Sequence, residues 1–106
     1  EVQIFVFFQY KPIIVLINRY LIKQKNFAKI KTANRIHSSY GLKHIAERHI
    51  GTYVSNGELI YAMYLEGYKI FPENINCMFN VSEPGIRHMI NSKPVMEALG
   101  TPLKEK

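Results

Sequence analysis

The residues best suited to chemistry lie within ten consecutive positions near the middle of the chain. They are Tyr40, Lys43, His44, Glu47, Arg48 and His49. On a helix, His44 shares a face with Glu47, three residues later, and with Arg48, four residues later. A histidine beside a carboxylate can move protons and a cation can hold a phosphate, so the set suits metal-independent RNA cleavage. His44, Glu47 and Arg48 are the candidate catalytic residues. The alternative interpretation is a solvent-exposed face of ion pairs.

The same stretch does not match a zinc site. Inverted zinc-protease motifs place the second histidine directly after the glutamate, whereas Arg48 separates Glu47 from His49. One residue turns a helix by about 100°, which directs His49 away and puts an arginine where a metal ion would bind. The chain also contains no aspartate, which excludes the Ser-His-Asp triad, the EF-hand loop and the Asp-based sites of phosphoryl transfer. We expect no cofactor.

Positive charge is concentrated in the first third of the chain. The formal net charge is +6; residues 1–37 carry seven basic side chains and one acidic side chain, whereas residues 38–106 carry seven of each. A basic segment beside a neutral body suits a polyanion, and nucleic acid is the commonest one. The alternative is a solvated basic surface. We expect phosphate contacts from Arg19, Lys23, Lys25, Lys29, Lys31, Arg35 and Lys43.

Two consecutive helices are expected to position the central residues. The first covers about 40–50, after a serine cap at Ser38 or Ser39, and a glycine ends it. The second runs to about Glu66 and opens with a capping box, in which Ser55 and Glu58 satisfy each other's backbone amides. A glycine ends this helix too.

Strands and short helices are expected on both sides of the helix pair. The apolar opening is interrupted by polar residues and Pro12 before it reaches the ~20 residues of a membrane span, so it is interpreted as a strand. A helix is then expected from residue 13 into the basic segment as far as about Lys31, with a strand as the alternative because Ile13–Val15 is a β-branched cluster. The remaining elements are strands at 68–71 and 77–81, a short helix capped by Ser82, another opened by Pro94, and a frayed polar tail at 101–106.

These elements predict one α+β domain over residues 1–106, with a central helical hairpin packed on a short, mostly antiparallel sheet. The basic third is 1–37 and the neutral part is 38–100. The single cysteine, Cys77, is expected to be a buried thiol, since no internal disulfide is available. A cytoplasmic location and no membrane partner are expected.

The helix pair resembles helix-turn-helix DNA-binding proteins of the phage or mobile-element type over Leu42–Gly67. The matching features are Ala46 in the first helix, Gly51 at the turn, Val54, and the Ser55 cap. The resemblance implies that residues near the start of the second helix reach base edges, namely Asn56, Glu58 and Tyr61. The second helix departs from the family because it contains no Lys or Arg. An ordinary helical hairpin is the alternative.

Three functions are compatible with the sequence. The first is a small nucleic-acid-binding protein, whose basic segment contacts phosphates while the helix pair at 39–67 orients the contact. The second is a ribonuclease, since a helix followed by antiparallel strands is similar in order to barnase-like enzymes. The third is a protein-binding inhibitor of a host or defence factor, whose partner would meet exposed tyrosines. A homo-oligomer is compatible with each.

Overall fold

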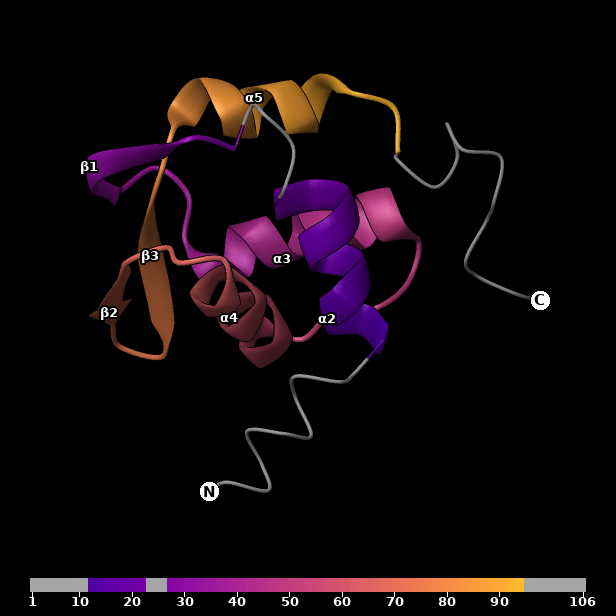
Figure 1. Cartoon of the computed structure of the whole chain (residues 1–106), viewed down its shortest axis with the longest axis horizontal. Helices are drawn as coiled ribbons and strands as arrows, with labels where there is room; N and C mark the ends of the chain where they lie inside the picture. Colours follow the sequence, from indigo (N-terminus) through magenta and orange to yellow (C-terminus); the bar gives the residue numbers. More distant parts are fainter. Residues whose placement is uncertain (1–11, 23–26, 95–106) are drawn as a thin grey trace.

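The computed structural model describes residues 12–22 and 27–94 of the chain. In chain order the elements are α2 (Pro12–Ile17), η1, a π-helical segment (Asn18–Ile22), β1 (Lys29–Asn34), α3 (Ser39–Ile50), α4 (Asn56–Leu65), β2 (Ile70–Glu73), β3 (Asn76–Val81) and α5 (Glu83–Asn91). The helices α2, α3 and α4 gather on one side of a three-stranded sheet, and α5 lies along its end (Figure 1). The expected α+β class, with a helical hairpin on an antiparallel sheet, is confirmed.

The sheet has the strand order β1-β3-β2, and both pairings are antiparallel. β2 and β3 form a regular hairpin that runs from Ile70 opposite Phe79 to Glu73 opposite Asn76. Its turn places Asn74 at a φ of 58°, in the left-handed region that asparagine tolerates better than most residues. β1 occupies the other edge, and its pairing with β3 contains a register shift.

Strand β1 replaces the end of the expected first helix. The predicted extension of that helix through Lys31 is wrong, because Lys29–Asn34 is a strand. The Asn80 side-chain amide holds it to β3 by donating to the Ile30 carbonyl at 2.9 Å. The first four residues of β1 are exposed, so the strand is held by its pairing with β3 rather than by burial of these side chains. Pairing with β3 therefore outweighs the helical propensity of a lysine-rich segment.

The two central helices begin and end as the sequence predicts. Ser38 caps α3, and Gly51 ends it in the left-handed conformation at a φ of 89°. Ser55 and Glu58 form the expected capping box of α4: the Glu58 amide donates to the serine hydroxyl at 3.1 Å, and the Ser55 amide donates to the carboxylate at 2.9 Å. Ser82 caps α5 by accepting from the Gly85 amide.

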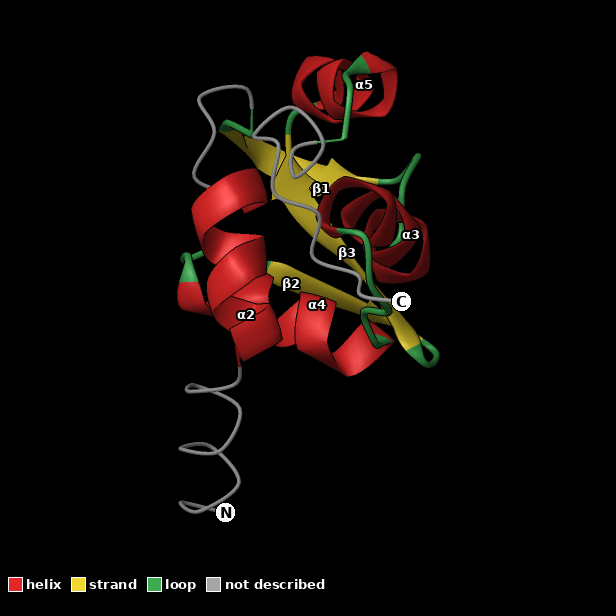
Figure 2. Ribbon diagram, turned by 90° about the vertical axis from the view of Figure 1, so that its right-hand side faces the viewer, coloured by secondary structure: helices red, strands yellow, loops and turns green. Residues whose placement is uncertain are grey.

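Figure 2 shows the helices in front of the sheet, and the buried apolar side chains of both form one core. Each of α2, α3, α4, β3 and α5 contributes apolar side chains with almost no exposed surface: Ile14, Ile17, Leu42, Ala46, Ile50, Leu59, Ala62, Met63, Phe79, Val81, Ile86 and Met89. Burial of this apolar area from water is the main source of stability. Ser39 is also fully buried, and its hydroxyl accepts from the Cys77 amide at 3.1 Å, which joins α3 to β3.

Some expected elements lie outside the described residues. They are the strand near the start of the chain, the short helix opened by Pro94, and the tail at 101–106. Among the helices that the structure describes, none has the length and apolar character needed to cross a membrane.

Candidate acid–base site on helix α3

The candidate site lies on the exposed side of α3. Leu42, Ala46 and Ile50 face the core and fix the rotation of the helix. That rotation brings His44 to the surface and leaves Glu47 partly covered. The name "α3 site" is used below for the five side chains that contact one another here: Tyr40, Lys43, His44, Glu47 and Tyr53.

Glu47 is the centre of the α3 site because it accepts three hydrogen bonds. Lys43 Nζ donates to it at 2.9 Å, His44 Nδ1 at 3.0 Å, and the Val54 backbone amide at 3.2 Å. Burial alone would raise the pKa of Glu47, but the hydrogen bonds from Lys43, Val54 and His44 outweigh it and hold the pKa below its ordinary value of 4.5. Glu47 is therefore a fixed anion at neutral pH.

His44 is the outer partner of this carboxylate. Its side chain is 50% exposed, and its ring meets Tyr40 edge to face at 4.6 Å between centroids. A carboxylate can only accept, so the nitrogen that faces Glu47, Nδ1, carries a proton. In the neutral ring, Nε2 then holds the lone pair, and it has no hydrogen-bond partner among the described residues. This is the arrangement of an oriented base: a partly covered anion behind the ring and a free nitrogen in front.

Lys43 is turned inward rather than toward a phosphate. Its side chain is buried, and its ammonium lies 4.6 Å from the ring centroid of Tyr53 and 5.6 Å from that of Tyr40. The hydrogen bond to Glu47 raises the pKa of Lys43 against the opposing effect of burial. The Lys43 ammonium thus contacts Glu47 and two tyrosine rings of the protein itself. Its positive charge helps to keep Glu47 ionised.

Arg48 also makes its contacts within the protein. Its guanidinium donates to the carbonyl oxygens of Met89 at 2.7 Å, Ile90 at 2.8 Å and Ser92 at 3.0 Å, at the C-terminal end of α5. These carbonyls lie at the end of α5, where the backbone leaves acceptors beyond the regular helical hydrogen bonds, and a cation is favourable at this end of the helix dipole. Of the three candidate catalytic residues, the structure therefore brings His44 and Glu47 together and directs the guanidinium of Arg48 to α5.

An open hollow of about 500 Å³ lies beside Glu47. It is lined by Glu47, Arg48, Gly51, Thr52 and Tyr53. It follows directly from the way α3 ends, because the left-handed Gly51 turns the chain back toward the last turn of the helix. Tyr53 was not among the candidate site residues; the sequence offered it only as one of seven tyrosines that could stack on bases or line a protein interface. Its position in the sequence could have identified it. An aromatic residue in a short connection between two helices has no place in the core pattern of either helix, which indicates another role.

The other basic candidates are spread over different elements. Lys29 and Lys31 are exposed on β1, where the Lys29 ammonium lies 4.7 Å from the Tyr68 ring centroid. Arg19 is exposed on η1, and Arg35 pairs with Glu73 at 3.3 Å. The remaining two candidates, Lys23 and Lys25, lie outside the described residues.

The residues implied by the helix-turn-helix resemblance contact other parts of the protein. The Asn56 amide donates to Asn76 Oδ1 at 3.2 Å and to the Ile75 carbonyl at 3.4 Å, so the β2–β3 turn lies against the start of α4. Glu58 is buried in the capping box. Tyr61 is half-buried and stacks on Tyr64, with 5.8 Å between ring centroids.

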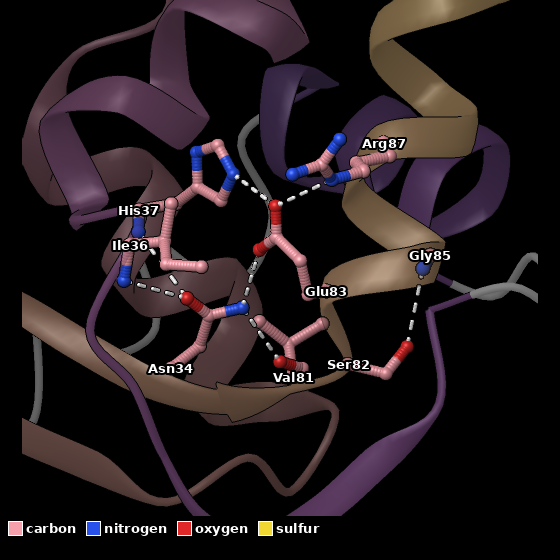
Figure 3. Close-up of polar contacts among 8 residues, drawn as sticks. All are labelled: Asn34, Ile36, His37, Val81, Ser82, Glu83, Gly85 and Arg87. Atoms are coloured by element: carbon pink, nitrogen blue, oxygen red, sulfur yellow. Dashed lines mark hydrogen bonds and ion pairs between the residues drawn. The ribbon is translucent and has the colours of Figure 1, made fainter.

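A second histidine–glutamate pair was not predicted. His37 Nε2 lies 3.0 Å from Glu83 Oε2, and Asn34 Nδ2 donates to Glu83 Oε1 at 3.0 Å and to the Val81 carbonyl at 3.0 Å. Figure 3 shows Glu83 between His37 and Arg87, whose Nε donates to it at 3.3 Å. Burial would raise the pKa of Glu83, but the contacts from Asn34, His37 and Arg87 outweigh it and lower that pKa.

This second cluster serves to hold the segment that precedes α3. Asn34 Oδ1 accepts from the amides of Ile36 at 2.9 Å and His37 at 3.2 Å, which shapes the chain just before the Ser38 cap (Figure 3). The cluster thereby fixes where α3 starts. The one sequence signal was Glu83 in the first turn of a capped helix, a position that favours a carboxylate but names no partner.

Within the part of the chain that the structure describes, no three His, Cys, Asp or Glu side chains lie close enough together to hold a metal ion. Three of the histidines instead contact hydrogen-bonding groups of the protein: His44 contacts Glu47, His37 contacts Glu83, and His49 contacts the Met89 carbonyl at 2.7 Å.

Comparison with known proteins gives no match for this chain. No family model matches it, and neither a curated protein nor a solved structure matches it significantly. The case for a function therefore depends on the geometry of the α3 site and on the chemistry that this geometry can perform.

Proposed function

We propose that this protein cleaves RNA, with His44 and Glu47 as its acid–base pair. The observation that carries the proposal is the contact between His44 Nδ1 and Glu47 Oε1 at 3.0 Å, with the imidazole half exposed and the carboxylate largely covered. A largely covered anion behind an exposed imidazole fixes the orientation of the ring and directs its outer nitrogen, as a base, toward solvent. RNA suits such a pair because it supplies its own nucleophile, the 2′-hydroxyl group.

The reaction follows from these two groups. His44 Nε2 removes the proton of a 2′-hydroxyl, whose oxygen attacks the adjacent phosphorus. The bond from phosphorus to the 5′-oxygen breaks, the leaving oxygen takes a proton from water, and a 2′,3′-cyclic phosphate and a 5′-hydroxyl result. The imidazolium formed on His44 is stabilised by Glu47 and returns its proton to solvent. General acid–base catalysis by one such group contributes about 10²- to 10⁴-fold in rate.

Two features distinguish this pair from an ordinary surface ion pair three residues apart. A surface pair leaves both partners solvated, whereas Glu47 also accepts from Lys43 and from the Val54 amide, and so keeps its place and its charge. The carboxylate partner, Glu47, also lines the hollow shared with Tyr53, where a substrate can approach the pair. The net charge of +6 favours the approach of an RNA.

The test is cleavage of a labelled single-stranded RNA in the presence of EDTA, with wild type, His44→Ala, Glu47→Gln and His88→Ala purified identically. His88 is an exposed histidine on α5 and serves as the matched control. We expect products ending in a 2′,3′-cyclic phosphate from wild type and His88→Ala, and at least about 100-fold less from His44→Ala. Circular dichroism checks that each variant is folded. No cleavage by wild type, or equal cleavage by His44→Ala, would refute the proposal.

A second candidate function is nucleic-acid binding without cleavage. It is supported by the exposed lysines Lys29 and Lys31 on an edge strand, within the basic third of the chain. Fluorescence anisotropy with labelled DNA and RNA tests it. Binding that weakens steeply with salt, and weakens further in Lys31→Glu but not in the control Lys69→Glu, while the RNA remains intact, would favour this function over the ribonuclease.

A further inference from the structure

We propose that Tyr53, supported by Tyr40, forms a base-stacking subsite that selects single-stranded RNA for the His44–Glu47 pair. The inference rests on the proposed function and adds the form of nucleic acid that the α3 site accepts. It depends on the position of two exposed tyrosine rings that neither the core nor the sheet requires.

The two rings are fixed by the lysine that they share. The Lys43 ammonium lies over the Tyr53 ring, 4.6 Å from its centroid, and 5.6 Å from the centroid of Tyr40. Tyr53 is nevertheless 69% exposed and Tyr40 is 54% exposed. The Lys43 ammonium therefore occupies only part of each tyrosine side chain, and much of the rest is open to solvent. Cation–π contact holds the ring in place in advance, which reduces the ordering entropy that a ligand would have to overcome.

The rings are directly connected to the acid–base pair. The contacts form a chain. The Tyr53 ring lies 4.6 Å from the Lys43 ammonium, which donates to Glu47 at 2.9 Å, and Glu47 in turn contacts His44 at 3.0 Å. On the other side, the Tyr40 ring touches the His44 ring edge to face. Tyr53 and Glu47 also line the same hollow. A base stacked on Tyr53 would thus bring its own nucleotide to the side of α3 on which His44 Nε2 is open.

A single-stranded nucleobase is the occupant that fits these features. Every base has a flat π face, and stacking on an aromatic side chain needs no particular sequence. A base inside a duplex is already stacked on both sides and cannot lie on Tyr53 unless the duplex opens. The mobile 2′-hydroxyl of an unpaired strand can also reach the in-line geometry that cleavage requires. The subsite therefore selects unpaired RNA by its shape.

The experiment measures binding apart from cleavage. A labelled single-stranded oligonucleotide with 2′-fluoro riboses has no nucleophile, so the protein can bind it but cannot cleave it. Anisotropy titrations compare wild type with Tyr53→Ala, Tyr53→Phe and the control Tyr64→Ala, an exposed tyrosine on α4. Stacking is lost in Tyr53→Ala, which we expect to bind roughly 5- to 150-fold more weakly. Tyr53→Phe and Tyr64→Ala should bind like wild type, and a duplex of the same sequence should bind more weakly than the single strand.

The results separate the subsite from the chemistry. Tyr53-dependent binding of the 2′-fluoro strand, with no cleavage of the matching RNA, would support the subsite and refute the ribonuclease. Equal binding by wild type and Tyr53→Ala, or a duplex bound as tightly as the single strand, would overturn the subsite even if RNA is cleaved. Absence of binding, together with a dimer in sedimentation that Tyr53→Ala abolishes, would also overturn it and assign the rings to an interface between two copies.

Discussion

The guanidinium of Arg48 donates to the carbonyl oxygen of Met89 at 2.7 Å, so a residue of α3 completes the end of α5. The neighbouring His49 contacts the same carbonyl from inside the core, also at 2.7 Å. Consecutive residues of one helix thus satisfy the end of another helix, one from the surface and one from the interior. This relationship makes the last turn of α3 a structural joint as well as one wall of the hollow beside Glu47.

Arg48→Ala is expected to lower the free energy of unfolding by about 1–2 kcal/mol, because three carbonyl groups lose a charged donor. The loss stays at the lower end of the range for charged hydrogen bonds because water can reach the Ile90 and Ser92 carbonyls. Urea unfolding measures it, with Arg87→Ala as the control. Arg87 makes an exposed ion pair with Glu83, whose removal should change stability by less than about 1 kcal/mol. Equal losses in the two variants would contradict the structural role of Arg48.

Two glycines next to the α3–α4 connection should respond to alanine with opposite signs. Gly51 has a φ of 89°, so Gly51→Ala is expected to lower the free energy of unfolding by about 1–2 kcal/mol. Gly57 lies in the first turn of α4 without a positive φ, so Gly57→Ala should raise it by about 0.4–1 kcal/mol. A new Cβ would have no neighbour within 4 Å at either position, so packing does not enter. Urea midpoints that shift in the same direction would contradict this account.

The serine caps offer a graded comparison. The Ser55 hydroxyl accepts from the Glu58 amide at 3.1 Å within a complete capping box, whereas the Ser38 hydroxyl lies 3.5 Å from the Gly41 amide, at the limit of a hydrogen bond. Ser55→Ala is therefore expected to lower the free energy of unfolding by about 1 kcal/mol, and Ser38→Ala by less. Thermal unfolding of both variants measures the order, and a larger effect at Ser38 would contradict it.

The sequence could predict those features that depend on neighbours a few residues apart. The caps of α3 and α4, the glycine that ends α3, and the contact between His44 and Glu47 all follow from helix geometry over three or four residues. The strands expected at 68–71 and 77–81 overlap β2 and β3, which pair with each other across a short turn. In each case the partner lies in the same element or in the next one along the chain, so periodicity, capping and turn chemistry are sufficient.

The features that were not predicted depend on partners far away in the chain. Strand β1 is held by Asn80, 50 residues after Ile30, and the β-branched Ile30 and Thr32 alone do not distinguish a strand from the end of a helix in this lysine-rich segment. The pair of His37 and Glu83 spans 46 residues. Arg48 has the spacing of a catalytic residue, and its actual contacts with the end of α5 emerge only when the two helices pack together. Such long-range pairing is decided by tertiary packing, which overrides local propensity.

The pH dependence of stability should be dominated near neutrality by His49. Its side chain has no exposed surface, and burial, with the nearby charge of Arg48, lowers the pKa of His49 below its ordinary value of 6.5 despite the contact with the Met89 carbonyl. The unfolded chain therefore takes up this proton at a higher pH than the folded chain does. The stability that His49 contributes is complete above about pH 6.5 and is lost as the pH falls below 6.5 toward the folded pKa.

Urea unfolding at several pH values between 7.5 and 5.5 should accordingly show stability falling with pH in wild type, by at most about 1.4 kcal/mol per pH unit for one proton. His49→Gln, which cannot titrate, should be less stable at high pH but show a flatter slope, whereas the control His88→Gln should keep the slope of wild type. Glu47 and Glu83 have pKa values below 4.5, so their contributions are lost only at more acidic pH and do not mask the effect. An unchanged slope in His49→Gln would show that the proton is taken up elsewhere.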